Sequence, residues 1–253
     1  MAVLGKGIAL YYRLKGMGIR LYAANAGFFI LLSLFPMAAV LLGLMHLTDL
    51  SPKDLLPGLL PQVLQESAGE LITTLWEKSD LTVLGISALT ALWSAGRGIH
   101  GLMLGLNAIY GVREARGYVK TRLICAGDTL LLLGMLLLYQ YGIRKIPETE
   151  YGLRSLVALV LQVTVFTFLY QVLPCGRYRL VESLPGGILT GTGWLLFLRL
   201  FSLYGRISTG LSSLWGPVYV VFLGMLWLYF GLRIFFLGGA VNALRMKKNV
   251  EKM

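Results

Sequence analysis

The sequence contains few of the residues that build disulfide frameworks, metal sites and water-exposed surfaces. Among its 253 residues are two cysteines and two histidines, and charged residues make up only 14%. Soluble domains are about one quarter charged, so this composition argues against a soluble domain. The single pair Cys125 and Cys175 does not make a disulfide framework, and His46 and His100 do not have metal-ligand spacing. We therefore expect free thiols, no metal and no other cofactor.

The motifs that carry common enzyme chemistry are also missing. The sequence has no P-loop, no HExxH pattern and no cluster of acidic residues for metal-assisted hydrolysis. The serine-rich stretch at 208–216 has no general base beside it in the sequence. We therefore expect that the protein is not an enzyme, and an intramembrane enzyme is the least favoured of the functions considered.

Long apolar runs dominate the chain, in which 57% of the residues are hydrophobic. A transmembrane helix needs about 20 mainly apolar residues. Six runs approach or reach this length, at 25–47, 81–96, 123–141, 153–173, 184–204 and 217–240. The sequence therefore predicts an all-α fold, a six-span transmembrane helical bundle that forms one integral membrane domain over residues 1–253.

The net charge of +11 is compatible with nucleic-acid binding or with the positive-inside bias of a membrane protein. A nucleic-acid-binding protein gathers Lys and Arg on a polar domain, whereas here they form short islands between the apolar runs. In the six-span topology, the most basic islands all fall on one side of the membrane. We therefore predict a multi-pass protein of the bacterial inner membrane with both termini in the cytoplasm, and no nucleic-acid partner.

Three segments outside the spans are predicted to be amphipathic. Residues 1–22 and 97–111 are predicted to form helices on the inner membrane surface, and 49–80 to form an extracytoplasmic amphipathic segment. The helix at 97–111 would follow a break at Gly96, which places Arg97 at the membrane boundary. The alternative is one longer span that contains both Arg97 and His100. Within the first span, Ser33 and Pro36 predict a kink or local unwinding.

Charged residues within the apolar runs are the main candidates for function, because each costs roughly 2.5 to 3.5 kcal/mol at a helix centre on insertion scales. We predict that Asp128 and Arg233 lie in the inner half of the membrane and form an ion pair or line one polar cavity. For Arg199 and Arg233 the alternative is that the side chain extends to the lipid headgroups. The full set of predicted substrate-binding residues is Arg97, Asp128, Arg199, Arg233, Asn25 and Asn107.

Small residues at helical spacing predict places where helices approach closely. One stripe consists of Gly101, Gly105 and Ala108. A GxxxG step is formed by Gly187 and Gly191, and a small cluster occupies 238–240. For the polar residues Asn25 and Asn107, hydrogen bonds between helices are the alternative to substrate binding.

Five motifs resemble the YihY/BrkB family of bacterial inner-membrane proteins. They are "LLSLFP" (31–36), "LWSAGRGI" (92–99), "LNAIYGVREARG" (106–117), "LPCGRYRLVESLPGG" (173–187) and "LWLYFGLRIFFLGGAVNAL" (226–244). The resemblance implies six spans with cytoplasmic ends. Members were once labelled ribonuclease BN, which is regarded as a misassignment, and others are suspected of moving lipid precursors of the envelope.

The resemblance carries over to the following positions: Ser33, Pro36, Trp93, Ser94, Arg97, Gly98, Asn107, Tyr110, Gly111, Pro185, Gly186 and Asn242. The family usually has a carboxylate just before the last of these, where this chain has Val241. This departure weakens any mechanism that depends on that acid.

Two functions are compatible with the sequence. The first is a transporter or flippase-like protein for an anionic substrate, with anionic lipids and lipid-linked envelope precursors as candidates and membrane lipids as its partners. The alternative is a non-transporting membrane scaffold or envelope-assembly factor, which would bind partners through segments 1–22 and 97–111. The sequence leaves open the substrate, the coupling ion, the direction of transport and the oligomeric state.

Overall fold

The computed structural model describes residues 16–46, 81–113, 116–117, 119–128, 130–131, 134, 151–176, 178–207 and 217–250. The described residues form helices and connecting segments and contain no strand. The long helices are α2 (Ile19–His46), α5 (Leu81–Tyr110), α7 (Tyr151–Val172), α8 (Leu180–Ile207) and α10 (Pro217–Val250). A shorter segment, here called the 119–131 segment, is helical at 119–128 and 130–131. The all-helical prediction is confirmed for this part of the chain.

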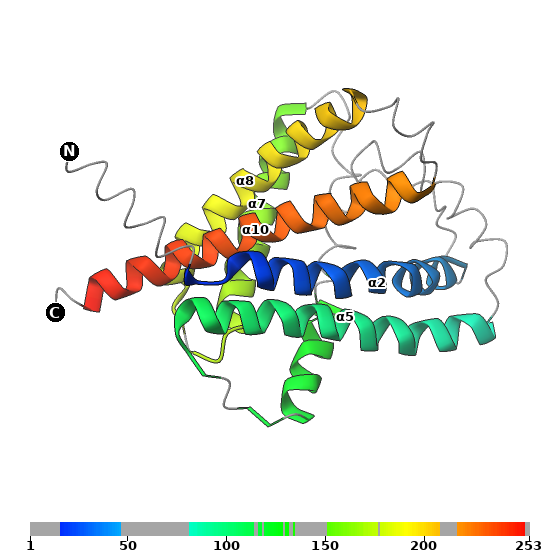
Figure 1. The fold of residues 1–253 in the computed structure, drawn as a ribbon, viewed down its shortest axis with the longest axis horizontal. Coiled ribbons are helices and arrows are strands. Elements are labelled where there is room, and N and C mark those ends of the chain that lie inside the picture. Colours follow the sequence, from blue (N-terminus) through cyan, green and yellow to red (C-terminus); the bar gives the residue numbers. More distant parts are fainter. Residues whose placement is uncertain are drawn as a thin grey trace.

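Helix α10 occupies a central place in the bundle (Figure 1). It packs against α2, α5 and α8, while α2 also packs against α5, and α7 against α8. In Figure 1, α2 and α5 run side by side, and α8 diverges from them along its length. The start of α2, the end of α5, the start of α8 and the end of α10 lie at one end of the bundle, here called the basic end.

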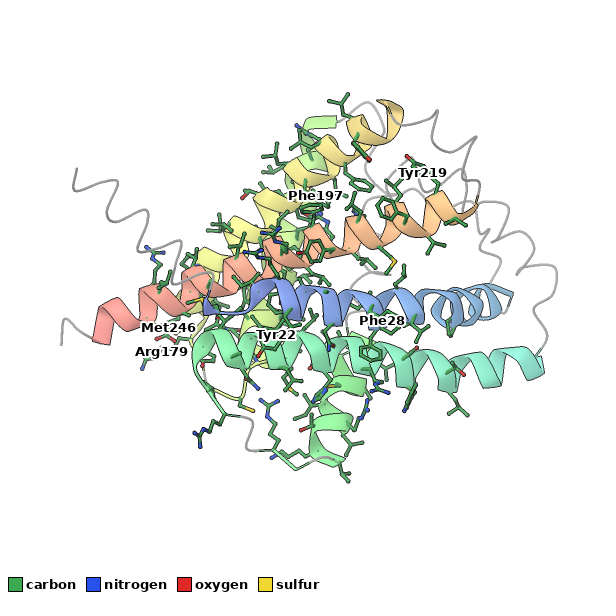
Figure 2. All side chains as sticks on the ribbon, viewed as in Figure 1. Tyr22, Phe28, Arg179, Phe197, Tyr219 and Met246 are labelled. Atoms are coloured by element: carbon green, nitrogen blue, oxygen red, sulfur yellow. The ribbon has the colours of Figure 1, made fainter. Side chains whose placement is uncertain are left out.

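The basic end brings together segments that are far apart in the sequence. The Tyr110 ring at the end of α5 lies 4.7 Å from the Tyr178 ring in the connection between α7 and α8. Arg179 and Met246 lie at this end, whereas Phe197 and Tyr219 lie toward the other end (Figure 2). Since the predicted inner-side islands flank these helix ends, the arrangement is compatible with the charge pattern. The membrane orientation and the six spans stay predictions.

Three stretches of the described helices are long and apolar enough to cross a membrane, Ser155–Val172, Leu180–Tyr204 and Val221–Met246. Large apolar side chains point outward from them. Leu156 is 57% exposed on α7, Leu196 60% exposed on α8 and Phe222 58% exposed on α10. Extensive exposed apolar surface marks contact with a membrane or a partner, because in water it is unfavourable.

Small residues explain why α2 and α5 lie close together. A Cβ atom at Gly98 would lie 3.3 Å from the backbone nitrogen of Ile30, and one at Gly101 would lie 3.1 Å from the Cα atom of Ala26. At Gly105 an added Cβ would meet the Phe236 ring of α10 and the Cβ atom of Tyr22 on α2. The predicted close approach at Gly101 and Gly105 is therefore confirmed. Ala108 is exposed, so it is not part of this contact.

Helix α5 ends where a glycine allows the backbone to turn. Gly111 has φ of +72°, a left-handed conformation that glycine adopts without steric cost. The N–H of Val112 donates to the carbonyl of Asn107 at 2.9 Å, and the N–H of Gly111 donates to the carbonyl of Ala108 at 3.3 Å. These two bonds form a Schellman motif, which satisfies carbonyl groups left open at a helix C-terminus.

The prediction of a helix break at Gly96 is wrong, because α5 is continuous from Leu81 to Tyr110. Residues 97–110 are therefore not a separate surface helix. The backbone forms one longer helix that contains both Arg97 and His100, as in the alternative, and its crossing of the membrane stays a prediction. The predicted apolar stripe of 97–111 is largely buried inside the bundle, at Ile99, Leu102, Met103, Leu106 and Ile109. Since the stripe packs on other helices of the chain, it has no need of a membrane surface.

Helix α2 is likewise continuous, from Ile19 to His46, with Pro36 inside it. The predicted local unwinding at Ser33 and Pro36 is therefore wrong, whereas a bend of the continuous helix stays a prediction. The Ser33 hydroxyl donates to the carbonyl of Ile30 at 2.7 Å, which is a bond within its own helix. Of the predicted segment 1–22, residues 19–22 belong to α2 and residues 1–15 lie outside the described residues. The predicted segment 49–80 also lies outside the described residues.

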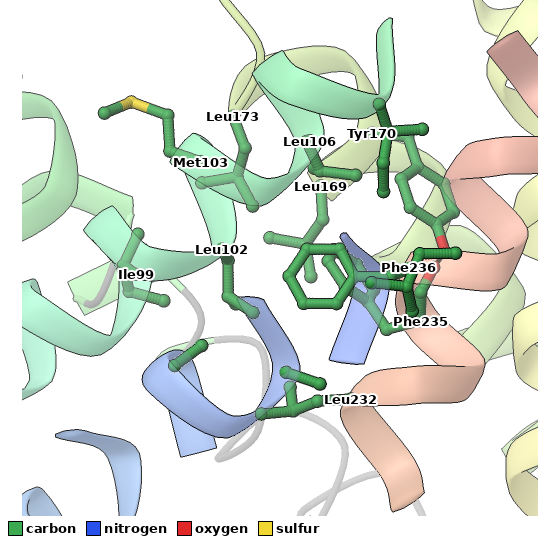
Figure 3. Close-up of a cluster of buried hydrophobic side chains, with 14 of the residues drawn as sticks. Ile99, Leu102, Met103, Leu106, Leu169, Tyr170, Leu173, Leu232, Phe235 and Phe236 are labelled. Carbon is green, nitrogen blue, oxygen red and sulfur yellow. Dashed lines mark hydrogen bonds between the residues drawn. The ribbon is translucent and has the colours of Figure 1, made fainter. Parts of the chain in front are cut away.

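The main core forms where α2, α5, α7 and α10 meet (Figure 3). Leu106 of α5 and Phe236 of α10 are fully buried there. The ring of Tyr170 on α7 stacks on Phe235 with centroids 4.9 Å apart. Cys125 of the 119–131 segment belongs to the same core, and neither Cys125 nor Cys175 forms a disulfide. The expectation of free thiols is therefore confirmed.

A second set of close contacts joins α7, α8 and α10. At Gly191 an added Cβ would lie 3.2 Å from the backbone nitrogen of Val163, and at Gly187 it would lie 3.0 Å from the carbonyl oxygen of the same residue. The predicted GxxxG contact is thus between α8 and α7. The Tyr170 hydroxyl lies 2.7 Å from Thr190 Oγ1 on α8 and donates to the carbonyl of Phe235 on α10 at 2.5 Å. One buried side chain therefore links three helices.

Candidate functional site

Arg97 lies within the length of α5, between aromatic rings of two helices. Its Cζ atom is 4.5 Å from the centroid of Phe29 on α2 and 5.1 Å from that of Trp93 on α5. Trp93 precedes Arg97 by four residues, so the two side chains share one face of the helix. Phe29 comes within reach because Gly98 lets the backbone of α2 approach α5.

The electrostatics of this arrangement favour an anion. A guanidinium over an aromatic ring gains roughly 0.5 to 2 kcal/mol, and the ring leaves its positive charge uncancelled. Among the described residues, no ion pair joins Arg97 to a carboxylate. The half-buried Arg97 is thus held in place by rings and can still donate hydrogen bonds to an anionic group.

An open groove of about 740 Å³ lies beside this arginine, between α5 and the 119–131 segment. Arg122 and Trp93 border it, and most of its remaining lining is apolar. The lining residues are Leu89, Thr90, Trp93 and Gly96 from α5, and Val119, Arg122, Leu123 and Ala126 from the 119–131 segment. Spacings of three and four residues on both helices place these side chains on facing stripes.

The other predicted arginines do not join Arg97. Arg199 is exposed on α8, which agrees with a side chain that extends away from the bundle. Arg233 is half-buried on α10, and its Cζ atom lies 5.7 Å from the Tyr229 ring and 5.9 Å from the Phe230 ring. Both rings belong to its own helix. A role of Arg199 and Arg233 in substrate binding stays a prediction.

The predicted ion pair between Asp128 and Arg233 is wrong for the structure described. Asp128 is 7% exposed, and its Oδ2 atom has no hydrogen-bond partner among the described residues. The charged side chain that interacts electrostatically with the Asp128 carboxyl group is Arg116. The reason is the placement of the helices, since α10 packs on α2, α5 and α8 and Arg233 lies over rings of α10 itself. Depth along a helix does not determine which neighbour a side chain faces.

Asn25 and Asn107 differ in their surroundings. Asn25 is exposed on α2. Asn107 is buried, and its Oδ1 atom accepts from the backbone N–H of Cys175 at 2.9 Å while its Nδ2 group faces the Cys175 sulfur at 3.7 Å. Asn107 therefore ties the end of α5 to the connection after α7, which is the predicted alternative to substrate binding.

Sequence reasoning missed the role of Arg116. Its Nη2 group donates to the carbonyl of Pro174 at 2.8 Å, and its Nη1 group contacts the sulfur of Met103 at 3.6 Å. In the same connection between α7 and α8 as Pro174, burial raises the pKa of the Tyr178 phenol above its ordinary value, so the phenol stays neutral. Nothing in the sequence separates Arg116 from the other basic residues between 97 and 122. By contrast, the spacing of Trp93 and Arg97 was visible and could have indicated the stacking.

Comparisons with known proteins agree with the membrane character of the helices. The family described as "Virulence factor BrkB" matches residues 10–252. The ribonuclease-like protein YfkH of Bacillus subtilis is 28% identical over 247 residues, which cover 89% of this chain and 90% of that protein. A UPF0761 membrane protein of Aromatoleum aromaticum is 28% identical over 246 residues, which cover 87% of this chain but 58% of the relative. No solved structure matches.

The family match spans nearly the whole chain, including all five long helices described above. The relatives named as membrane proteins agree with the three apolar helices that are long enough to cross a membrane. The chain therefore belongs to the BrkB family and is a membrane protein.

Proposed function

We propose that this protein is a transporter or flippase-like protein of the bacterial inner membrane, for an anionic and lipid-linked substrate. The observation that carries the proposal is Arg97, whose guanidinium is fixed between Phe29 and Trp93 within α5. In the predicted six-span topology, burying the Arg97 charge beside lipid costs free energy unless a negative group offsets it. Charges inside a membrane are rare and mark pathways for ions and substrates. An anionic headgroup would offset that cost.

The alternative, a non-transporting scaffold, loses one of its two supports. It depended on amphipathic segments at 1–22 and 97–111 that would bind partners at the membrane surface. The apolar stripe of the second segment is buried against the bundle, so it is not available to a partner. We also propose that the protein has no enzymatic activity. The ribonuclease-like name belongs to the relative in Bacillus subtilis.

Replacing Arg97 by glutamine tests the proposal. In liposomes that contain the purified protein and a fluorescent anionic phospholipid, we expect lipid to cross the bilayer faster than in empty liposomes. Arg97→Gln should slow this movement at least about tenfold, because hydrogen bonds to a charged group contribute about 1.5 to 3 kcal/mol. The rate is followed by adding a membrane-impermeant quencher that reaches only the outer leaflet.

The matched control is Arg113→Gln, which removes an exposed arginine just beyond the end of α5. This variant should transport lipid at the wild-type rate. Arg97→Lys should give an intermediate rate, because lysine keeps the charge but loses the planar stacking and the paired donors. Wild-type protein that moves neither anionic nor zwitterionic lipid faster than empty liposomes would contradict the proposal.

A further inference from the structure

The groove between α5 and the 119–131 segment combines an apolar floor with a cationic border. Leu89, Val119 and Leu123 are 74%, 70% and 69% exposed, so the lining is accessible from the surface of the bundle. Arg122 borders the groove, and Arg97 stacks on Trp93, which also lines it. Lipid acyl chains contact the outside of any membrane helix, but a groove bordered by the Arg122 guanidinium favours one class of lipid.

We infer that this groove binds one anionic phospholipid, with its phosphate at Arg122 and an acyl chain along Leu89, Val119 and Leu123. The inference deepens the proposed function and rests on it for the class of substrate. Two properties of the site select this occupant. Guanidinium groups bind phosphate through several N–H donors, and the apolar lining gains by covering a hydrocarbon chain.

The charge of the surrounding residues supports an anion over a zwitterion. Of the two basic residues in the described part of the 119–131 segment, Arg122 lines the groove, whereas Lys120 is exposed outside the lining. Asp128, the acidic residue of the described part of this helix, is buried away from the surface and is acted on by Arg116. A headgroup with a net negative charge is therefore attracted, whereas the choline of a zwitterionic lipid would add a cation to a positive site.

The geometry also separates a lipid from a free anion. A soluble phosphate would need only Arg122, and filling the apolar part of the groove would leave its binding intact. A phospholipid needs both parts of the site. Removing the charge and filling the groove are therefore two independent changes that should each weaken lipid binding.

The experiment measures lipid bound to the purified, delipidated full chain by native mass spectrometry. The probes are dioleoyl-phosphatidylglycerol, dioleoyl-phosphatidylcholine and inorganic phosphate. The wild-type protein should retain one phosphatidylglycerol at concentrations where phosphatidylcholine is not retained. Arg122→Gln should weaken this binding about tenfold, since it removes a charged hydrogen-bond donor. Ala126→Phe should weaken it at least as much, because the added ring fills the groove.

Two control variants come from the same helix. Lys120→Gln removes an exposed charge outside the groove lining, and Gly127→Phe adds a ring where a Cβ meets nothing within 4 Å. Both should bind phosphatidylglycerol as the wild type does. All variants are first compared by size-exclusion elution and helical content, so that loss of binding is not confused with loss of folding.

The other outcomes overturn the inference or the proposed function, and they distinguish the two. Equal retention of the two lipids would remove its anionic selectivity, and equal binding by all variants would mean a lipid belt without a specific site. Displacement of lipid by inorganic phosphate, with Ala126→Phe silent, would indicate a free-anion site. Selective binding without lipid transport would contradict the proposed function but leave the groove standing. Transport with unchanged binding by Arg122→Gln and Ala126→Phe would contradict the groove alone.

Discussion

Gly238→Ala is expected to lower the thermal unfolding midpoint by roughly 2–12 °C, because it places a methyl group where α8 and α10 touch. A Cβ atom at Gly238 would lie 2.8 Å from the carbonyl oxygen of Gly186 and 2.5 Å from the Tyr170 hydroxyl. The first of these is a backbone atom, so it cannot move aside unless the two helices separate. Overpacking of this kind costs about 1–3 kcal/mol, and each kcal/mol shifts the midpoint of a chain of this size by roughly 2–4 °C.

The measurement is the intrinsic tryptophan fluorescence of the detergent-solubilised protein during heating. The matched control is Gly224→Ala on the same helix, where the added Cβ would meet only the Leu31 side chain at 3.8 Å. That variant should melt at or slightly above the wild-type temperature, since alanine favours helix over glycine. If the two variants melt together, α8 and α10 are not in the close contact described at Gly238.

Asn242→Ala is expected to destabilise the same junction from the other side. Asn242 is fully buried on α10, and its Oδ1 atom accepts from the backbone N–H of Gly186 at 2.6 Å. Its Nδ2 group donates to the carbonyl of Ser183 at 3.1 Å. Pro185, which lies between Ser183 and Gly186 in the sequence, has no backbone N–H to donate. Removing the amide leaves two buried backbone groups without this partner, at a cost of about 1–3 kcal/mol for each group that stays unsatisfied.

The expected result for Asn242→Ala is a fall of several degrees in the same fluorescence melt. Asn25→Ala serves as the control for stability, because Asn25 is exposed on α2 and its removal should leave the midpoint unchanged. The double variant with Gly238→Ala should lose less than the sum of the two single effects, because both changes loosen one contact. Strict additivity would mean that the two residues act at separate places.

The positions of the helices could be predicted from the sequence for a physical reason. Apolar runs of this length have to be buried in protein or lipid, and their backbone groups have to be paired within the helix. The runs predicted at 153–173, 184–204 and 217–240 correspond to α7, α8 and α10 with boundaries shifted by a few residues or, at the end of α10, by ten. Glycine spacing also indicated contacts, as Gly101 and Gly191 demonstrate, because close approach requires small residues.

The candidate site was predicted only in part. Arg97 could be singled out as a charge directly after an apolar run, and Trp93 four residues earlier was visible, yet the contact with Phe29 was not. Placing Arg97 at the membrane boundary predicts a break at Gly96, which the continuous helix α5 contradicts. Stacking on Phe29 requires a contact between residues 68 positions apart along the chain, and nothing local specifies such a contact.

The sequence by itself determined that the chain is helical and apolar, because hydrophobic run length and charge spacing are local properties. The tertiary structure alone decided which faces meet. It made α5 one helix by burying the stripe that follows Arg97, and it placed Asp128 near Arg116 and not Arg233. It also brought Asn242 to the turn of α8 that contains Pro185. These pairings depend on how whole helices pack, so no single segment encodes them.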